Sequence, residues 1–279
     1  MPLSYLLAEM AQGMQAVMEH FDWGQYALFA VLLCVLVVVE HFWPRRKMSG
    51  GAWGRRRVNL LLYGVGGLLM WWVAEPVQTA AVRMGASLGW AGLAGAALPD
   101  ILKIVIGVLL VDVIQYALHR ASHAIPLLWR MHQVHHADAA FDVTTSVRHH
   151  PLEVMALAAL TLMLCAALGL PLVSLLLYAV LQLVHTAFCH ANVAIPLPWD
   201  RALRWVMVTP DMHRVHHSER MDEGNSNFGM IFPWWDRLLR TYCAQPALGH
   251  QDMHLGLAND SARPDGFWRA VCQPFGKLS

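Results

Sequence analysis

The chain has 279 residues, of which 57% are hydrophobic and only 14% are charged, and its mean hydropathy is +0.41. About a quarter of the residues in a soluble domain are charged, so this composition predicts an integral membrane protein. The formal net charge of +1 provides no basic field that would attract nucleic acid, and no nucleic-acid partner is expected.

Long apolar segments follow one another along the first 190 residues. Residues 1–23 lack the basic start of a signal peptide and are expected to form an amphipathic helix. A helix needs about 20 apolar residues to cross a bilayer. Residues 87–98 are too short for this and are expected to be re-entrant or interfacial. The predicted membrane spans are residues 25–43, 58–78, 101–118, 153–169 and 172–190.

The segment between the first two spans sets the expected orientation. Residues 44–57 contain six basic residues and no acidic one, which is typical of a cytoplasmic loop. Counting spans from that loop places residues 119–150 and 190–279 on the same cytoplasmic side. The membrane is expected to be a bacterial inner membrane.

We predict an all-α fold, a membrane bundle with about four to five membrane-embedded helices and a cytoplasmic helical cap. The chain is read as one membrane domain, because no further domain's worth of residues remains. Its parts are the N-terminal spans with the basic loop (1–100), a core (101–243) and a C-terminal tail (244–279). Tryptophans lie among arginines after residue 191 (Trp199, Trp205, Trp234 and Trp235 among Arg201, Arg204, Arg237 and Arg240), as in segments at a membrane interface. The five cysteines form no C-x-x-C pair, and no disulfide framework is expected.

Histidine is the unusual residue of this chain. Twelve of its 16 histidines lie between residues 119 and 217, and most fall into three clusters with i, i+3 or i, i+4 spacing. Such spacing places side chains on one face of a helix, and neutral imidazole is a good ligand for transition metals. Eight inward-facing imidazoles are enough for two metal ions with open positions. They are His119, His123, His132, His135, His136, His213, His216 and His217.

Four further histidines lie close to these clusters in the sequence. His190, at the end of the fifth predicted span, is expected to be a ligand, whereas His185 is about 140° away around the helix and remains open. In the motif "RHHPLE" at most one of the adjacent pair His149 and His150 can face the metal, and His150 is favoured. The histidines expected not to bind metal are His20, His41, His250 and His254.

The kind of metal is left open by the ligands alone. A zinc peptidase would need H-E-x-x-H, with the glutamate as base, and neither "HRASH" nor "HQVHH" has this glutamate. A histidine-rich paired site suits a redox metal at least as well, but imidazole does not choose between iron and zinc. Asp112 and Tyr116 stand two turns and one turn before His119, respectively, and we expect them to support a ligand imidazole.

These boxes, His119-x-x-x-His123, His132-x-x-His135-His136 and His213-x-x-His216-His217, resemble those of the fatty acid hydroxylase superfamily. This group contains sterol desaturase-like and sphingolipid hydroxylase-like membrane oxygenases with a non-haem di-iron centre. The resemblance covers about residues 105–243 and extends to "RHHPLE", "FCHANV" and "NSNFGMIFPWWDRLLRTY". In the last of these, Asn227 and Asp236 are expected to lock the segment in place.

The resemblance implies two iron ions held by the eight box histidines and His190, with His185 less certain because the spacing of that pair varies. It also implies O2 as co-substrate, a lipid substrate, and electrons from a separate electron-transfer protein or reductase. Zinc is expected to replace iron in part of an overexpressed sample. The predicted activity is hydroxylation or desaturation of a lipid C–H bond, and no residue pattern separates a sterol from a sphingoid base, a carotenoid or a fatty acyl chain.

Two other functions remain open. An acyl-lipid desaturase also uses histidine boxes, but the histidines of its first box usually have a different spacing, and it lacks the "RHHPLE" and "NFG" motifs. A metal transporter or sensor would bind metal without catalysis. It would be expected to place polar ligands at mid-membrane depth, whereas these clusters stand at the ends of the predicted spans.

Overall fold

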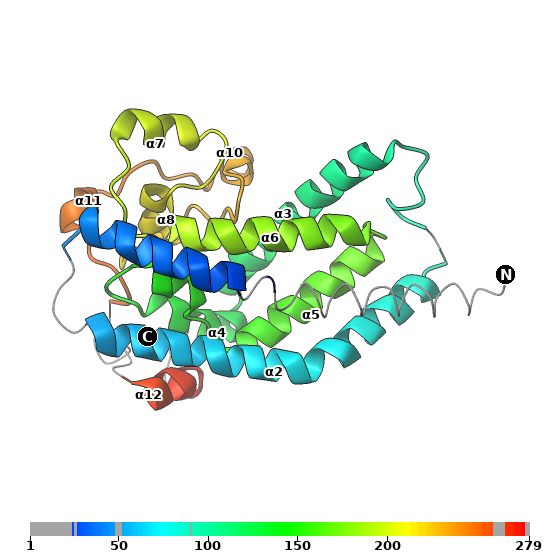
Figure 1. Ribbon diagram of the computed structural model, residues 1–279, viewed down its shortest axis with the longest axis horizontal. Helices are drawn as coiled ribbons and strands as arrows, with labels where there is room; N and C mark the ends of the chain where they lie inside the picture. Colours follow the sequence, from blue (N-terminus) through cyan, green and yellow to red (C-terminus); the bar gives the residue numbers. More distant parts are fainter. Residues whose placement is uncertain (1–23, 25–26, 48–51, 90, 259–265, 277–279) are drawn as a thin grey trace.

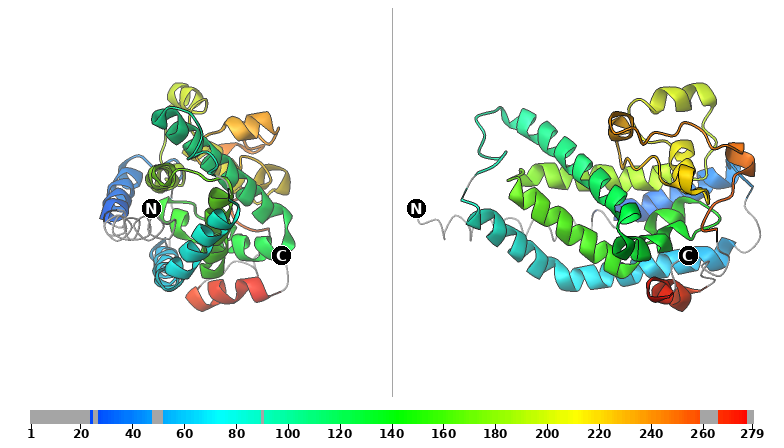
Figure 2. Two further views of the ribbon diagram at one scale, coloured as in Figure 1. Left: turned by 90° about the vertical axis from the view of Figure 1, so that its right-hand side faces the viewer. Right: turned by 180° about the vertical axis from the view of Figure 1, so that it is seen from behind.

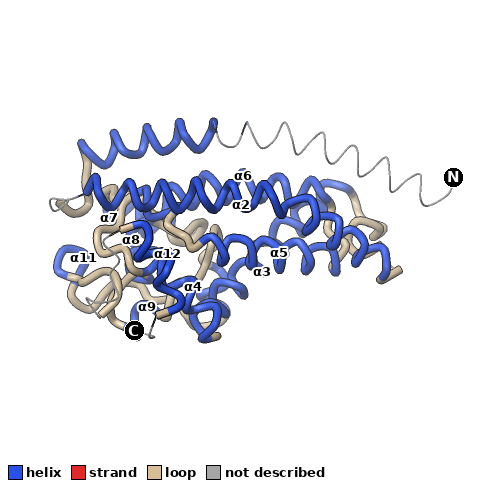
Figure 3. Tube along the Cα trace, turned by 90° about the horizontal axis from the view of Figure 1, so that it is seen from below, coloured by secondary structure: helices blue, strands red, loops and turns tan. Residues whose placement is uncertain are grey.

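The computed structural model describes residues 24, 27–47, 52–89, 91–258 and 266–276. The predicted amphipathic helix 1–23, with His20, lies outside the described residues. Residues 25–26 of the first predicted span and 48–51 of the basic loop lie outside them as well. Within the described part of the chain all regular structure is helical, with only two isolated β-bridges, which confirms the predicted all-α fold (Figure 3).

Five long helices run roughly along the length of the molecule (Figure 1). They are Ala27–Phe42, α2 (Ala52–Ser87), α3 (Asp100–Ala124), α5 (Pro151–Ala167) and α6 (Leu172–Cys189). Three stretches among the described residues are long and apolar enough to cross a membrane: Trp53–Ala74, Asp100–Ala124 and Leu172–Cys189. The helices Ala27–Phe42 and Pro151–Ala167 are apolar but shorter.

The long helices leave large apolar side chains on their outer faces. Helix α2 packs along α5, and α3 packs against α6, while on α2 Leu68 is 66% exposed and Trp71 and Trp72 are more than 70% exposed. Water-soluble proteins rarely expose contiguous apolar surface of this kind, whereas lipid accommodates it. The outer faces of the helices therefore fit a hydrocarbon environment.

At one end of the bundle, glycines allow two chain segments to touch. Gly92 and Gly169 both have positive φ, and a Cβ on Gly92 would lie 2.3 Å from the carbonyl oxygen of Leu168. Leu93 N donates to Leu168 O at 3.2 Å and Ala94 N donates to Gly169 O at 2.8 Å. The short segment after α2 thus docks on the turn between α5 and α6. Its expected re-entrant or interfacial position stays a prediction.

Short helices gather at the other end of the bundle, where they pack around the ends of the long ones (Figure 2). They are α4 (Pro126–His136), η1 (Val143–Val147), α7 (Leu197–Leu203), α8 (Pro210–His216), α9 (Met221–Gly224), α10 (Trp234–Leu238), α11 (Gly249–Asp252), α12 (Phe267–Cys272) and η3 (Gln273–Phe275). All three histidine boxes belong to this end of the molecule.

A buried ionic network ties α2 to the chain that follows α4. Arg55 pairs with Asp138 at 2.6 Å and also with Asp142, and the fully buried Arg148 donates to Asn59 Oδ1 and to the carbonyl oxygen of Val134, both at 2.8 Å. Burial alone would raise the pKa of Asp138, but the charges of Arg55 and Arg148 reverse this and lower it. Because each buried charge has a partner, the network fixes the end of α4 instead of destabilising it.

Candidate metal centre

The end of α3 and the two short helices α4 and α8 bring the histidine boxes together. His119 and His123 occupy the last two turns of α3, and Pro126 starts α4 immediately afterwards. Pro210 starts α8 after Thr209, whose hydroxyl accepts a hydrogen bond from Met212 N. Proline is favoured at the first position of a helix because its missing N–H has no partner there. The first box therefore lies at the end of a long helix, and the other two lie on or next to short helices that begin with proline.

The eight histidines of the three boxes and His190 fall into two groups whose ring nitrogens converge. Within each group the potential ligand atoms lie within 4.8 Å of one another. Group one consists of His119, His123, His132, His136 and His216, and group two consists of His135, His190, His213 and His217. The boxes on α4 and α8 contribute to both groups, so the groups are adjacent: the rings of His136 and His217 stack at 4.5 Å.

The spacing between nitrogens fits metal ligands. His136 Nε2 lies 3.2 Å from His132 Nε2, and His190 Nε2 lies 3.3 Å from His135 Nε2 and 3.0 Å from His213 Nε2. Two nitrogens at about 2.0–2.1 Å from one ion would be about 2.8–3.4 Å apart for angles between 90° and the tetrahedral angle. The observed separations fall within this interval.

Unpartnered nitrogens point to the same conclusion. His123 Nε2, His216 Nε2 and both ring nitrogens of His217 are buried without a hydrogen-bond partner. A buried polar atom without a partner costs about 1–3 kcal/mol. Metal coordination would satisfy one nitrogen of each of these three rings, so the residues present fit a pair of metal ions.

Backbone carbonyls fix the orientation of several imidazoles from outside. The Nδ1 of His119 lies 2.9 Å from Phe228 O, that of His216 lies 2.7 Å from Ser226 O, and that of His190 lies 2.8 Å from Thr186 O. A carbonyl oxygen only accepts, so each Nδ1 donates its hydrogen. The Nε2 then carries the lone pair that a metal needs.

Glu153 gives the same support to His132, although it was not among the residues predicted from sequence. Its Oε1 lies 2.5 Å from His132 Nδ1, and its Oε2 lies 3.3 Å from the Nδ1 of His149. The ring of His149 stacks on His135 at 4.4 Å with an angle of 9°. The sequence signal was the glutamate of "RHHPLE", four residues after His149, where the first turn of α5 can bring both to one place.

Five imidazoles on or next to α4 and α8 are held in the neutral form. Burial first, and then the neighbouring histidines, keep the pKa of His135, His136, His213, His216 and His217 well below the usual value. Only the neutral ring offers a lone pair to a metal ion. The site is thus prepared for cations at neutral pH.

Comparison with known proteins identifies the family to which this sequence is similar. Residues 104–241 match the sequence model of the family described as fatty acid hydroxylase. The chain belongs to the fatty acid hydroxylase superfamily. It is 30% identical over 179 residues to an ornithine lipid hydroxylase from Rhizobium tropici, an alignment that covers 64% of this chain and 52% of the relative.

Two further relatives of this fatty acid hydroxylase chain are oxygenases by name. An alkylglycerol monooxygenase from Homo sapiens is 26% identical over 135 residues, which cover 48% of this chain and 29% of the relative. A methylsterol monooxygenase from Aspergillus fumigatus is 30% identical over 151 residues, which cover 52% and 49%. The matches thus span about half or less of each relative's length, and no solved structure matches the chain.

The hydroxylase region also contains two predicted ligands that the structure does not bring into either group. His150 caps α5: its Nδ1 accepts from Leu152 N at 3.2 Å, and its Nε2 lies 3.1 Å from Val271 O. The Nε2 of His185 lies 3.0 Å from Val208 O. Neither belongs to the sets of converging ligand atoms among the described residues.

Asp112 and Tyr116 of the hydroxylase region also have partners other than the expected imidazole. Asp112 accepts hydrogen bonds from the hydroxyl of Tyr178 at 2.8 Å and from the indole N–H of Trp235 at 2.7 Å, as well as from the backbone of residues 231–232. The hydroxyl of Tyr116 lies 2.8 Å from that of Thr241. Both residues anchor the segment after α9 onto α3 and α6, so any effect on the ligands is indirect.

Asn227 and Asp236 lock this same segment over the two groups of histidines. Asn227 has φ of 51° and donates to Met212 O at 3.0 Å and to Cys243 O at 2.8 Å. Asp236 accepts from the backbone N–H groups of Phe228 and Gly229, both at 2.8 Å. These bonds hold in place the two carbonyls that orient His119 and His216.

Proposed function

We propose that the chain is a membrane-bound oxidoreductase that hydroxylates a C–H bond of a lipid with O2 and electrons from a separate electron-transfer protein. The balanced reaction is R–H + O2 + 2 e⁻ + 2 H⁺ → R–OH + H2O. The observation that supports this most directly is the pair of adjacent imidazole groups, whose Nε2 atoms are spaced at 3.0–3.3 Å like ligands. The named activities of the superfamily relatives point to the same class of reaction.

Two iron ions are the proposed metals, one held by group one and one by group two. Bound iron would supply the redox chemistry that reduces O2 and attacks an unactivated C–H bond. The chain's own part is to hold neutral imidazoles in fixed tautomers, through Glu153 and the carbonyls of Ser226 and Phe228. It also shields most of the ligands from bulk water, since eight of the nine histidines are buried and only His123 is partly exposed.

A substrate from the membrane fits the position of the site. His119 and His123 end an apolar helix of membrane length, so the imidazole groups lie where such a helix would leave the hydrocarbon. A transporter would be expected to bind metal at mid-membrane depth, and these ligands stand at the helix end instead. We therefore favour a lipid-modifying enzyme over a metal carrier.

The test is to load the purified protein anaerobically with Fe²⁺ and then add O2, a reductant and a membrane lipid extract. Mass spectrometry is expected to find a lipid product that has gained one oxygen atom. The double variant His135→Ala/His216→Ala removes one ligand from each group and is expected to lose bound iron and product. His41→Ala, which changes an exposed histidine outside both groups, serves as the control.

Other outcomes select other functions. A product that has lost two hydrogen atoms without gaining oxygen would show a desaturase. Metal flux into proteoliposomes without any lipid oxidation would favour a transporter. Undiminished oxidation by the double histidine variant would refute the assigned metal centre.

A further inference from the structure

A mainly apolar cavity of about 200 Å³ reaches group one of the metal centre. Two of the residues that line it, His123 and His136, belong to that group. Trp129, Met221 and Leu257 supply apolar side chains from α4, α9 and the C-terminal segment. His123 is the one member of the two groups that is not fully buried. This cavity therefore gives access to the ligands from outside.

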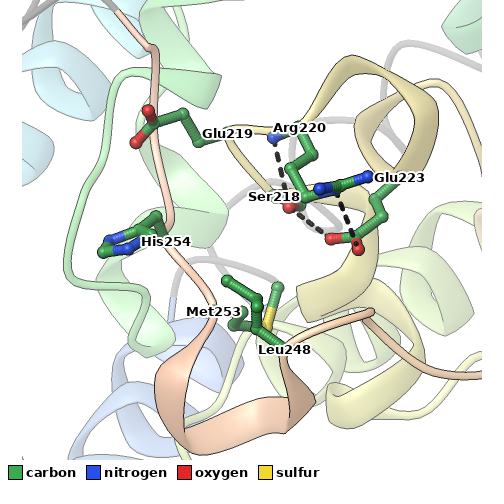
Figure 4. Close-up of a pocket in the computed structure, with 7 residues that line it drawn as sticks. All are labelled: Ser218, Glu219, Arg220, Glu223, Leu248, Met253 and His254. Atoms are coloured by element: carbon green, nitrogen blue, oxygen red, sulfur yellow. Dashed lines mark hydrogen bonds and ion pairs between the residues drawn. The ribbon is translucent and has the colours of Figure 1, made fainter.

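A second, smaller pocket of about 100 Å³ lies next to the apolar cavity, since Ser218 and Glu219 line both. Five of the seven residues that line it are polar or charged, and the other two, Leu248 and Met253, are apolar. Figure 4 shows Arg220 and Glu223 on one side of this pocket and His254 on the other. Ser218 Oγ donates to Glu223 Oε2 at 2.6 Å, and Arg220 Nε lies 3.4 Å from Glu223 Oε1. Charges of both signs thus surround the pocket.

The two neighbouring cavities have the polarity of the two parts of an amphiphile. An apolar chamber favours hydrocarbon through the hydrophobic effect, and a polar one pairs with charged or hydroxyl groups. A volume of about 200 Å³ is below the about 300–1,000 Å³ that is usual for compact drug-sized ligands. A single alkyl chain fits a chamber of this size better than a fused ring system does.

We propose that the two cavities bind one lipid, with a segment of its alkyl chain against His123 and His136 and its polar end beside Glu219 and Arg220. This inference rests on the proposed function and specifies its substrate class as a lipid with a flexible hydrocarbon chain. The chain segment lies between Trp129 and Leu257, and Met221 stands at the exposed side of the cavity, with 62% of its surface accessible.

The test uses photolabelling, which does not depend on activity. The iron-loaded protein in nanodiscs is irradiated with a fatty acid that has a diazirine on its alkyl chain, and separately with a photoreactive cholesterol. Peptide mass spectrometry locates the labels. The fatty acid is expected to label Trp129, Met221 or Leu257, whereas the cholesterol probe labels the outer faces of the long helices.

Two variants narrow the cavity, and one leaves it unchanged. Leu257→Trp and the more exposed Met221→Trp are expected to reduce cavity labelling by about tenfold, because a bulky ring overpacks the chamber. Leu127→Trp introduces the same ring at a 69% exposed position of α4 that does not line the cavity, and labelling is expected to match the unmodified protein. Met221 is exposed, so that variant keeps the test valid even if Leu257→Trp fails to fold.

The outcomes separate this inference from the proposed function. If the unmodified protein oxidises no lipid, the proposed function fails, whatever the labels show. If it oxidises lipid, but both cavity variants label and react like the unmodified protein, only the cavity assignment is overturned. Labelling of the cavity by cholesterol and not by the fatty acid would overturn the assignment to an alkyl chain.

Discussion

At the scale of single residues, the least expected feature is the acidic support of one ligand. Glu153 is the one carboxylate in the clusters of potential metal ligands among the described residues. It accepts from His132 and faces His149, whose ring covers His135. One carboxylate therefore acts on ligands of both groups. Such outer partners orient imidazoles and raise their basicity.

Replacing Glu153 by glutamine tests this support. Glutamine keeps one acceptor but turns an N–H group toward either His132 or His149, so one of the two contacts is lost. We expect the affinity for Fe²⁺ or Co²⁺ to fall by about 10–100-fold, the usual effect of losing such a partner. Titration against a competing chelator measures this. Asp222→Asn, a change of an exposed carboxylate on α9, should leave the affinity unchanged. Equal affinities for both variants would contradict the role of Glu153.

His250, which was predicted not to bind metal, is expected to make the stability of the fold depend on pH. It is buried on α11 with Nε2 3.6 Å from Asp211 Oδ2. Burial lowers its pKa from 6.5 to about 4. The charge of Asp211 opposes this shift, while Arg214, Arg45 and Arg204 add to it. Because the folded pKa lies below the unfolded value, this residue's contribution to stability is present above about pH 6.5 and is lost as the pH falls towards 4.

The matching measurement compares the melting temperature of the unmodified protein with that of His250→Gln between pH 4 and pH 7.5. Glutamine does not titrate, so the difference between the two proteins isolates His250 from other groups. We expect the unmodified protein to lose melting temperature relative to the variant as the pH is lowered from about 6.5 to about 4. A difference that is independent of pH would show that His250 protonates equally easily in both states.

At the scale of elements, the spacing of the boxes predicted the main part of the site. Residues three and four apart share a helical face, so the ligand sets on α3, α4 and α8 followed from sequence. The choice between His149 and His150 did not follow from this rule. Proline at 151 forces the preceding residue into an extended conformation, with φ of −69° and ψ of 134°. His150 therefore caps α5, and His149 is the member of the pair that lies beside the site.

The periodicity of the sequence could not predict the long-range contacts that orient the ligands. The carbonyls that orient His119 and His216 belong to Phe228 and Ser226, on an irregular segment with no helical or strand pattern. Helix α2 also extends beyond the predicted membrane span of residues 58–78 at both ends, from Ala52 to Ser87, and contains Pro76. Lipid and packed neighbours allow such a proline inside a helix.

The irregular segment provides an element-scale prediction at Asn227. Its positive φ suits asparagine or glycine, while its side chain makes the bonds to Met212 and Cys243. Asn227→Gly removes the bonds and keeps the backbone conformation, whereas Asn227→Ala also adds about 1–2 kcal/mol of backbone strain. We expect the melting temperature and the iron content to fall in the order unmodified protein, glycine variant, alanine variant. Equal values for the two variants would show that the positive φ is without cost.

At the scale of the whole molecule, the basic loop of residues 44–57 both predicts the orientation in the membrane and forms ion pairs near the metal centre. It suggested the cytoplasmic orientation, yet several of its charges belong to ion pairs in the structure. Arg45 pairs with Asp211, and Arg55 and Arg56 pair with Asp142. These arginines connect the start of α2 and its preceding segment to the short helices around the metal centre. The orientation of the loop and that of the site are therefore coupled.

Cysteine labelling tests that orientation. Cys272 is exposed on α12 at the end of the molecule that holds the site, whereas Ala97 is exposed in the segment before α3. With Cys34 and Cys243 replaced by serine, we expect a membrane-impermeant maleimide to modify Cys272 only from the cytoplasmic side. In a variant that also has Cys272→Ser and Ala97→Cys, the reagent should react only from the outside. The reverse pattern would place the metal centre on the opposite face of the membrane.

Metal removal reports on the whole fold, because the two groups join α3, α4, the end of α6 and α8. Without a metal, several buried ring nitrogens lack partners, and each such atom costs about 1–3 kcal/mol. A ligand that binds only the folded state stabilises it by about 2.7 kcal/mol when its concentration is 100 times its dissociation constant. Chelation is therefore expected to lower the melting temperature, and added Fe²⁺ should restore it in a concentration-dependent way. Hydrogen exchange should accelerate first in α4 and α8, whose short helices depend on the site, and last in α5 and α6.

The double variant His135→Ala/His216→Ala is the control for metal removal, and its melting temperature should show no response to chelator. A melting temperature that is the same with and without metal would mean that the imidazole groups are held together by the surrounding packing alone.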